Sequence, residues 1–323
     1  MTRLPTIAAA LALAASLALP ASAQEYPTQP VRIIVPFGPG GGSDIVTRII
    51  GESMQKRLGQ PFVVENKPGA GGTIGNEMVS RAAPDGYTIG IMTAGQIIAA
   101  AMTKQMRYDT LTAFDPIAQV GTAGLVIVTR ADYPSNNTKD LVEAAKAAPG
   151  TIVFASPGFG ATQHLSAELF KQTAGINMLH VPFRTSPEAI TALIGKQVDV
   201  LFDTVPAVLG QLQSGQLKAL AMTGKERFPA LPNVPPAIES GVLPDYDVTT
   251  WYGFFGPKGM QPAIVAKLNK AFLETIAEPE VIERLTKAGA VPKGSTPEAF
   301  GTFMAGEFAK WNSVREKAGL EQK

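Results

Sequence analysis

The chain has 323 residues, with 28 Lys and Arg against 27 Asp and Glu, and 45% of its residues are hydrophobic. This balanced charge argues against nucleic acid or an anionic membrane surface as a partner. The absence of cysteine excludes disulfides, thiolate metal sites, cysteine nucleophiles and a lipid-modified N-terminal cysteine. Because the length exceeds that of a usual single core, two domains are expected.

The first 23 residues have the layout of a secretory signal peptide. Arg3 precedes an uncharged apolar stretch at residues 7–19, and Pro20 and Ala21-Ser-Ala23 follow it. The stretch is shorter than the about 20 residues that span a bilayer. We therefore predict cleavage after Ala23 and a periplasmic protein without a lipid anchor. An uncleaved membrane anchor is the alternative.

Short runs rich in Val and Ile alternate with segments of helical period, a pattern typical of βαβ units around a mostly parallel sheet. In the first half, strands are expected at residues 31–35, 62–65, 87–93 and 114–120, with helices at 45–58 and 73–81. A first crossing between two lobes is expected near Gly124.

The same alternation continues in the second half. Strands are expected at residues 125–129, 152–155, 178–181, 198–202 and 217–222, with helices at 139–147, 162–174, 187–194 and 205–213. The proline-rich stretch 228–236 cannot form a regular element and is interpreted as the return to the first lobe. A strand near residue 250 and a mostly helical segment at 262–317 follow. The predicted lobes are residues 24–124 plus 246–323, and residues 125–245, with two crossings that permit a hinge.

Two glycine-rich turns each follow a predicted strand and precede a predicted helix. They read Gly38-Pro-Gly-Gly-Gly-Ser-Asp44 and Ser156-Pro-Gly-Phe-Gly-Ala-Thr162. The first amides of a helix have no intrahelical partner, and the positive end of the helix dipole lies behind them. Glycine allows a ligand oxygen to approach the backbone closely. The two turns therefore predict anion receptors that act on one ligand from two lobes.

Motifs in the same order along the chain resemble the substrate-binding proteins of tripartite tricarboxylate transporters, the Bug-type family. They are the segment from Tyr26 to Asp44, Val64-Glu-Asn-Lys-Pro-Gly-Ala-Gly-Gly-Thr73, Pro84-Asp-Gly-Tyr-Thr88, the Ser156 turn with His164, and Thr250-Trp-Tyr-Gly253. The resemblance implies an α/β, two-lobed type II periplasmic-binding-protein fold. It also implies capture of a small organic carboxylate by both turns and delivery to a membrane permease, without enzymatic activity or a cofactor.

Two segments depart from the family pattern, namely residues 181–186 and 93–96. They leave the ligand open among dicarboxylates, amino acids and aromatic acids. The candidate ligand-binding residues are Phe37, Gly38, Gly40, Gly41, Gly42, Ser43, Asp44, Thr93, Ser156, Gly158, Gly160, Ala161, Thr162, His164, Arg184, Asp203 and Trp251.

Several of these residues have a second interpretation. Asp44 would cap the first helix, and Arg184 would be a solvated side chain instead of a fork for a second carboxylate. Asp203 would cap the helix after it instead of accepting from a ligand, and Trp251 would be core instead of a pocket wall. His164 and Glu168 share a helix face but lack further metal ligands, which favours a structural histidine.

The sequence can be compared with the requirements of four other functions. A dinucleotide-binding oxidoreductase would use the Gly38 turn with Glu65, but Ser43 replaces the last glycine and Pro39 lacks an amide donor. Neither a P-loop lysine nor the Gly-x-Ser-x-Gly turn of serine hydrolases is present. A ligand sensor for a signalling partner would have the same pocket as a transport receptor, so this alternative stays open. We expect a monomer with no catalytic or metal-binding residues.

Overall fold

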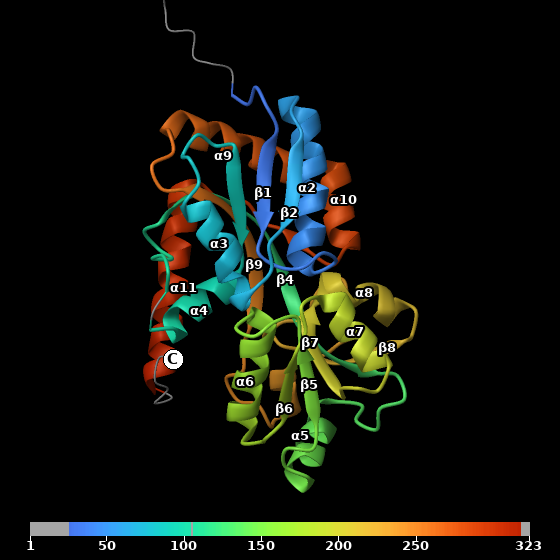
Figure 1. Ribbon diagram of the computed structural model, residues 1–323. Coiled ribbons are helices and arrows are strands. Elements are labelled where there is room, and N and C mark those ends of the chain that lie inside the picture. Colours follow the sequence, from blue (N-terminus) through green and yellow to red (C-terminus); the bar gives the residue numbers. More distant parts are fainter. Residues whose placement is uncertain (1–25, 105, 318–323) are drawn as a thin grey trace, which may run out of the picture.

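The computed structural model describes residues 26–104 and 106–317, so the predicted signal peptide lies outside the described residues. Figure 1 shows two lobes, one above the other, each with strands in the middle and helices around them. The strands follow the order β2-β1-β3-β9-β4-β7-β5-β6, and β8 and β10 pair with β4 outside this path. The predicted two-lobed α/β fold is confirmed.

The first lobe contains the outer strands of one end of the sheet. These are β1 (Val31–Val35), β2 (Phe62–Asn66) and β3 (Thr88–Met92), which pair in parallel. Its helices are α2 (Gly42–Leu58), α3 (Thr73–Ser80) and α4 (Ala94–Met102), with α9 (Pro262–Ile276), α10 (Pro279–Lys287) and α11 (Pro297–Lys317) from the C-terminal part of the chain. The C-terminal helices thus pack beside elements that are distant from them in the sequence.

The second lobe contains β5 (Val153–Ser156), β6 (Leu179–Pro182) and β7 (Val200–Thr204), again paired in parallel. Strand β8 (Leu217–Met222) lies on the other side of β4. The helices are α5 (Thr138–Ala147), α6 (Thr162–Ala174), α7 (Ser186–Ile194) and α8 (Val205–Gln213). These elements match the βαβ alternation of the sequence within a few residues.

Two long strands join the lobes. In β4 (Phe114–Arg130), the residues up to Gly124 pair with β9 (Thr249–Pro257), and Leu125 onward pairs with β7 and β8. The expected strands at 114–120 and 125–129 are therefore one strand, whose partners change after Gly124. All pairings of β4 and β9, including that with β10 (Val291–Pro292), are antiparallel, so the sheet is mixed.

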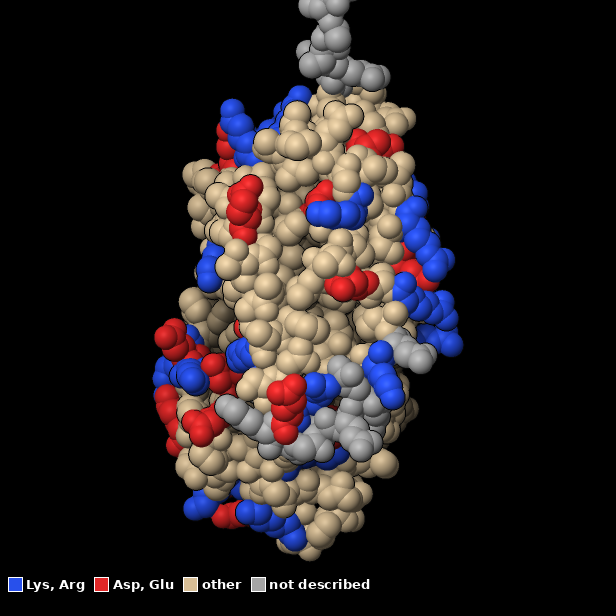
Figure 2. Space-filling model, turned by 90° about the vertical axis from the view of Figure 1, so that its left-hand side faces the viewer, with Lys and Arg blue, Asp and Glu red and all other residues tan. Residues whose placement is uncertain are grey.

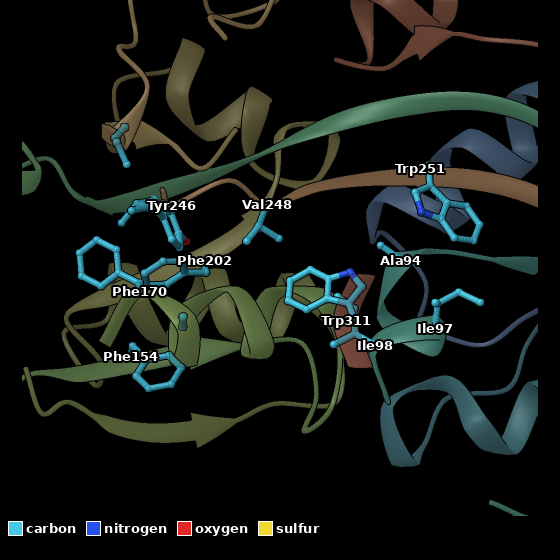
Figure 3. Packing of buried hydrophobic residues seen from close by; sticks show 14 of the residues in the cluster. Ala94, Ile97, Ile98, Phe154, Phe170, Phe202, Tyr246, Val248, Trp251 and Trp311 are labelled. Carbon is cyan, nitrogen blue, oxygen red and sulfur yellow. The ribbon is translucent and has the colours of Figure 1, made fainter. Parts of the chain in front are cut away.

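Buried aromatic side chains hold the second lobe to the returning chain. Phe170 of α6 meets Phe202 and Tyr246 edge to face, at ring centroid distances of 5.5 and 5.8 Å. The Tyr246 hydroxyl lies 2.7 Å from the Ser166 hydroxyl, so its polar end is satisfied although the ring is fully buried. Figure 3 shows this group apart from Trp251, which lies beside Ala94. Each such ring contributes roughly 1.5–3 kcal/mol by burial.

The charged side chains are distributed over the surface without a large patch of one sign on the face shown in Figure 2, where Lys and Arg lie among Asp and Glu. Of the described helices, none is both long enough and apolar enough to span a membrane.

Candidate ligand-binding site

A small cavity of about 20 Å³ lies where the carboxyl ends of the parallel strands of both lobes meet. This volume holds about one water molecule. Its lining comprises Phe37, Gly38, Gly41, Gly42, Ser43, Thr93, Pro157, Thr162, Gln163, Thr185, Ser186, Thr204, Thr250 and Tyr252. None of these side chains carries a charge at neutral pH. An anion at this position would therefore be bound by backbone amides, hydroxyls and helix dipoles.

Five of the described helices begin at the cavity, one of which is α4 with its N-cap Thr93. Helix α2 follows its N-cap Gly41, α6 begins at Thr162, α7 at Ser186, and α8 follows its N-cap Thr204. The amides of Gly41, Gly42 and Ser43 donate to no acceptor among the described residues. Each helix adds roughly half a positive charge at its N-terminus. The convergence gives the cavity a positive electrostatic environment to which both lobes contribute.

Asp44 is buried beside this cavity, but its charge is directed away from it. It accepts from the Gly40 amide at 3.0 Å, from Asn66 Nδ2 at 2.9 Å and from Arg48 Nε at 3.0 Å. Burial opposes ionisation of Asp44, but the hydrogen bonds from Arg48, Gly40 and Asn66 outweigh it and hold the pKa below its usual value. The ionised carboxylate of Asp44 thus has its charge offset by Arg48, and its hydrogen bonds hold the turn in place.

The second turn is held from behind by two histidines. Ser156 Oγ lies 2.8 Å from His180 Nε2, and the Gly160 amide donates to His164 Nδ1 at 3.1 Å. The Ala161 amide donates to the Gly158 carbonyl. The amides of Gly160 and Ala161, which the sequence suggested as ligand donors, are therefore used inside the turn. The next residues, Thr162 and Gln163, line the cavity instead.

The two histidine rings stack with centroids 4.1 Å apart. Burial and then the neighbouring His164 lower the pKa of His180 to about 4, so this ring is neutral at pH 7. Glu168 lies 3.7 Å from His164 Nε2. No group of three or more potential metal ligands occurs among the described residues. These contacts support the structural interpretation of His164.

Asp203 lies at the end of β7 and is completely buried. Its Oδ1 accepts from the Thr204 amide at 2.7 Å and from Gln163 Nε2 at 3.2 Å. Its Oδ2 accepts no hydrogen bond of ordinary geometry from the described residues. Burial raises the pKa of Asp203 to about 6, against the opposing hydrogen bonding of Ser186, Thr204 and Gln163.

Glycines of the first lobe allow the second lobe to approach closely. A Cβ at Gly42 would lie 2.5 Å from Thr204 Oγ1, and a Cβ at Gly95 would lie 2.7 Å from the Thr162 amide nitrogen. A Cβ at Gly38 would lie 2.3 Å from Thr185 Cγ2. These separations are shorter than real Cβ contacts. The absence of a side chain at these positions is therefore required for the observed contact between lobes.

The structure places the predicted residues in three groups. Those that line the cavity are Phe37, Gly38, Gly41, Gly42, Ser43, Thr93 and Thr162. Those in the turns or directly behind the lining are Gly40, Asp44, Ser156, Gly158, Gly160, Ala161, His164 and Asp203. Arg184 is exposed, and Trp251 is a core residue packed against Phe300 and Phe303.

The candidate residues did not include seven lining residues, namely Pro157, Gln163, Thr185, Ser186, Thr204, Thr250 and Tyr252. Each lies at or near the end of a strand or the start of a helix that the sequence predicts. In β9, alternate side chains point to the same face, so Thr250 and Tyr252 share a face that excludes Trp251. This period of two in the sequence could have identified Thr250 and Tyr252 as lining residues. Helix α4 was also not expected. Its signal is the capping box of Thr93 and Gln96, whose Oε1 accepts from the Thr93 amide at 2.8 Å.

Comparison with known proteins identifies the family. The family model described as "Tripartite tricarboxylate transporter family receptor" matches residues 46–320. The chain belongs to this family. It is thus a solute-binding receptor of a transporter and not an enzyme, which removes the oxidoreductase alternative.

Individual relatives agree with this assignment. Protein BugT from Bordetella pertussis is 34% identical over 325 residues, covering 100% of this chain and 99% of BugT. The periplasmic binding protein BugD is 39% identical with a TM-score of 0.88, covering 92% of this chain and 100% of BugD. MatC from Rhodopseudomonas palustris, solved with bound malate, is 32% identical with a TM-score of 0.85, covering 90% and 99%. The receptor is accordingly a periplasmic protein.

Proposed function

We propose that this receptor binds a small organic carboxylate in the cavity between its lobes and delivers it to the permease of a tripartite tricarboxylate-type transporter. The observation that carries the proposal is the convergence of the N-termini of α2, α6, α7 and α8 on one cavity without charged lining. Such termini favour anions, and the hydroxyls of Ser43, Thr162 and Tyr252 add further donors. The malate bound to MatC is a ligand of this chemical class.

Ligand entry requires the lobes to separate. The cavity of about 20 Å³ is far smaller than the roughly 300–1,000 Å³ of typical ligand pockets. The hinge that we propose lies where β4 changes partners, after Gly124, and where the chain returns near Tyr246. The lobes are then residues 24–124 plus 246–323, and residues 125–245. A ligand that contacts both turns stabilises the closed arrangement.

The route to the periplasm is also part of the proposal. A signal peptide removed after Ala23 would release a soluble monomer with 27 basic and 27 acidic residues, because Arg3 is the only charge removed. The intact mass of protein from the periplasmic fraction should correspond to a chain that begins at Gln24. Retention of the first 23 residues in a membrane fraction would contradict this part of the proposal.

Carboxylate binding is tested by a thermal-shift screen of organic acids in which each acid is paired with its amide. At 100 times the dissociation constant, a ligand stabilises the folded protein by about 2.7 kcal/mol, which gives a measurable shift of the melting temperature. We expect a shift with an acid such as malate and none with its diamide, because the helix termini act on negative charge. Equal shifts with both would contradict the anion receptor.

A further inference from the structure

Three buried oxygen atoms beside the cavity lack hydrogen-bond partners of ordinary geometry among the described residues. They are Asp203 Oδ2, Thr204 Oγ1 and the Tyr252 hydroxyl. Thr204 and Tyr252 both line the cavity, and a Cβ built on Gly42 would lie within 2.6 Å of both hydroxyls. Asp203 is joined to two lining residues, Thr204 and Gln163. Buried polar groups without well-formed hydrogen bonds are rare and point to a ligand that completes them.

We propose that Asp203, directly behind the cavity lining, takes up one proton from solvent when an organic carboxylate binds, so that the receptor captures carboxylate and proton together. This assignment rests on the proposed function. In the free protein the ionised carboxylate of Asp203 bonds the Thr204 amide at the start of α8. Its negative charge thereby offsets part of the positive charge at the N-terminus of α8.

An anionic ligand in the cavity adds a second negative charge beside Asp203 and so opposes the ionisation of its carboxyl group. Two carboxylates that share a buried site cannot both be ionised easily, and the pKa of one of them rises strongly. Within residues 26–104 and 106–317, no basic side chain contributes to the pKa of Asp203 and so offsets the repulsion. Its polar neighbours are Gln163 of α6, Ser186 of α7, Thr204 at the start of α8 and the Tyr252 phenol of β9.

Of these neighbours, Tyr252 is the one that can titrate. Burial, followed by the charge of Asp203, raises its pKa, so the phenol stays protonated and remains a donor. Val126, the partner of Asp203 on β4, is apolar. In the ligand-free protein the carboxyl of Asp203 already has a pKa of about 6. A modest further rise of this pKa on ligand binding is therefore enough to protonate Asp203 near neutral pH. The protonated Oδ2 then becomes a hydrogen-bond donor directly behind the cavity lining.

Calorimetry with malate in two buffers of different ionisation enthalpy measures the protons taken up per ligand. At pH 7 we expect close to one proton for the wild type and for Asp132→Asn, which removes an exposed carboxylate of the same lobe. Asp203→Asn should bind malate with no uptake. Above pH 7 the wild-type affinity should fall by up to tenfold per pH unit, whereas that of Asp203→Asn should stay constant.

Malate binding without proton uptake in the wild type would overturn the assignment, as would equal uptake in Asp203→Asn. A failure of every organic acid to bind the wild type would instead remove the proposed function, and the assignment with it. If Asp203→Asn does not fold, infrared difference spectra of the wild type decide the question. The carbonyl band of a protonated carboxyl group should appear on addition of malate, and its absence would overturn the assignment.

Discussion

Gly42 and Thr204 approach each other across the two lobes so closely that a Cβ on Gly42 would lie 2.5 Å from Thr204 Oγ1. Gly42 begins α2 and Thr204 caps α8, so the contact joins two of the helix termini that surround the cavity. The start of α2 is thus in close contact with the second lobe.

Gly42→Ala should therefore weaken ligand binding by tenfold or more, about 1.4 kcal/mol, because the added methyl group holds the lobes apart. The free energy of unfolding should change by less than about 1 kcal/mol, since the backbone there suits any residue. Gly210→Ala is the matched control, because a Cβ at Gly210 meets nothing within 4 Å. Calorimetry on both variants measures the effect, and equal affinities would show that the contact does not limit closure.

Tyr252→Phe should affect ligand binding and Trp251→Ala should affect stability, because successive residues of β9 point to opposite faces of the strand. Tyr252→Phe removes a hydroxyl that lines the cavity and should cost about 1.5–3 kcal/mol of binding energy to an anion, with little loss of stability. Trp251→Ala removes a core side chain and should cost about 3–5 kcal/mol of stability.

Urea unfolding and calorimetry on these two variants separate the effects. Loss of affinity in Trp251→Ala under conditions where that variant is fully folded, together with unchanged affinity in Tyr252→Phe, would reverse the two roles.

Most elements of the fold could be predicted from local patterns. The Val- and Ile-rich runs gave β1, β5 and β7, and the apolar rows after Gly41 gave α2. Helix α4 was not expected because its residues are apolar on all sides and show no amphipathic period. The continuity of β4 could not be predicted, because two short runs separated by glycines have the same pattern as two strands. Its antiparallel pairing with β9 depends on a segment more than 100 residues away.

The loops that line the cavity could be predicted from the sequence, but the individual atoms available to a ligand could not. Residues of both glycine turns line the cavity at strand ends, as the sequence predicted, and their role in ligand binding stays a prediction. Which amides stay available depends on contacts between distant residues, such as that of Gly160 with His164 and of Ser156 with His180. The choice between Trp251 and Tyr252 depends on which face of β9 is buried.

Asp203→Asn should stabilise the ligand-free protein increasingly as the pH rises. The folded pKa of about 6 lies above the unfolded value of 3.8, so stability due to the neutral acid is complete below about pH 4 and is lost as the pH rises through 6. The asparagine variant does not pay this cost and should gain about 3 kcal/mol over the wild type by pH 7. Urea unfolding at pH 4.5 and 7.5 measures the difference, and a constant difference would contradict the raised pKa.

His180 should make the protein less stable in acid. Its folded pKa of about 4 lies below the unfolded value of 6.5, so the stability from the neutral ring is complete above pH 6.5 and is lost as the pH falls towards 4. His180→Gln keeps a hydrogen-bonding group near Ser156 but cannot be protonated. The melting temperature of this variant should therefore fall less than that of the wild type between pH 7 and 4.5. An equally steep fall would show that His180 titrates normally in the folded protein.

A crystal structure of the receptor with the carboxylate that gives the largest thermal shift tests the central claim most directly. The account predicts carboxylate oxygens within about 3.2 Å of backbone amides at the start of α2 and at the start of α6, in the cavity between the lobes. A carboxylate held by Arg or Lys side chains outside this cavity, or by amides of one lobe only, would contradict it.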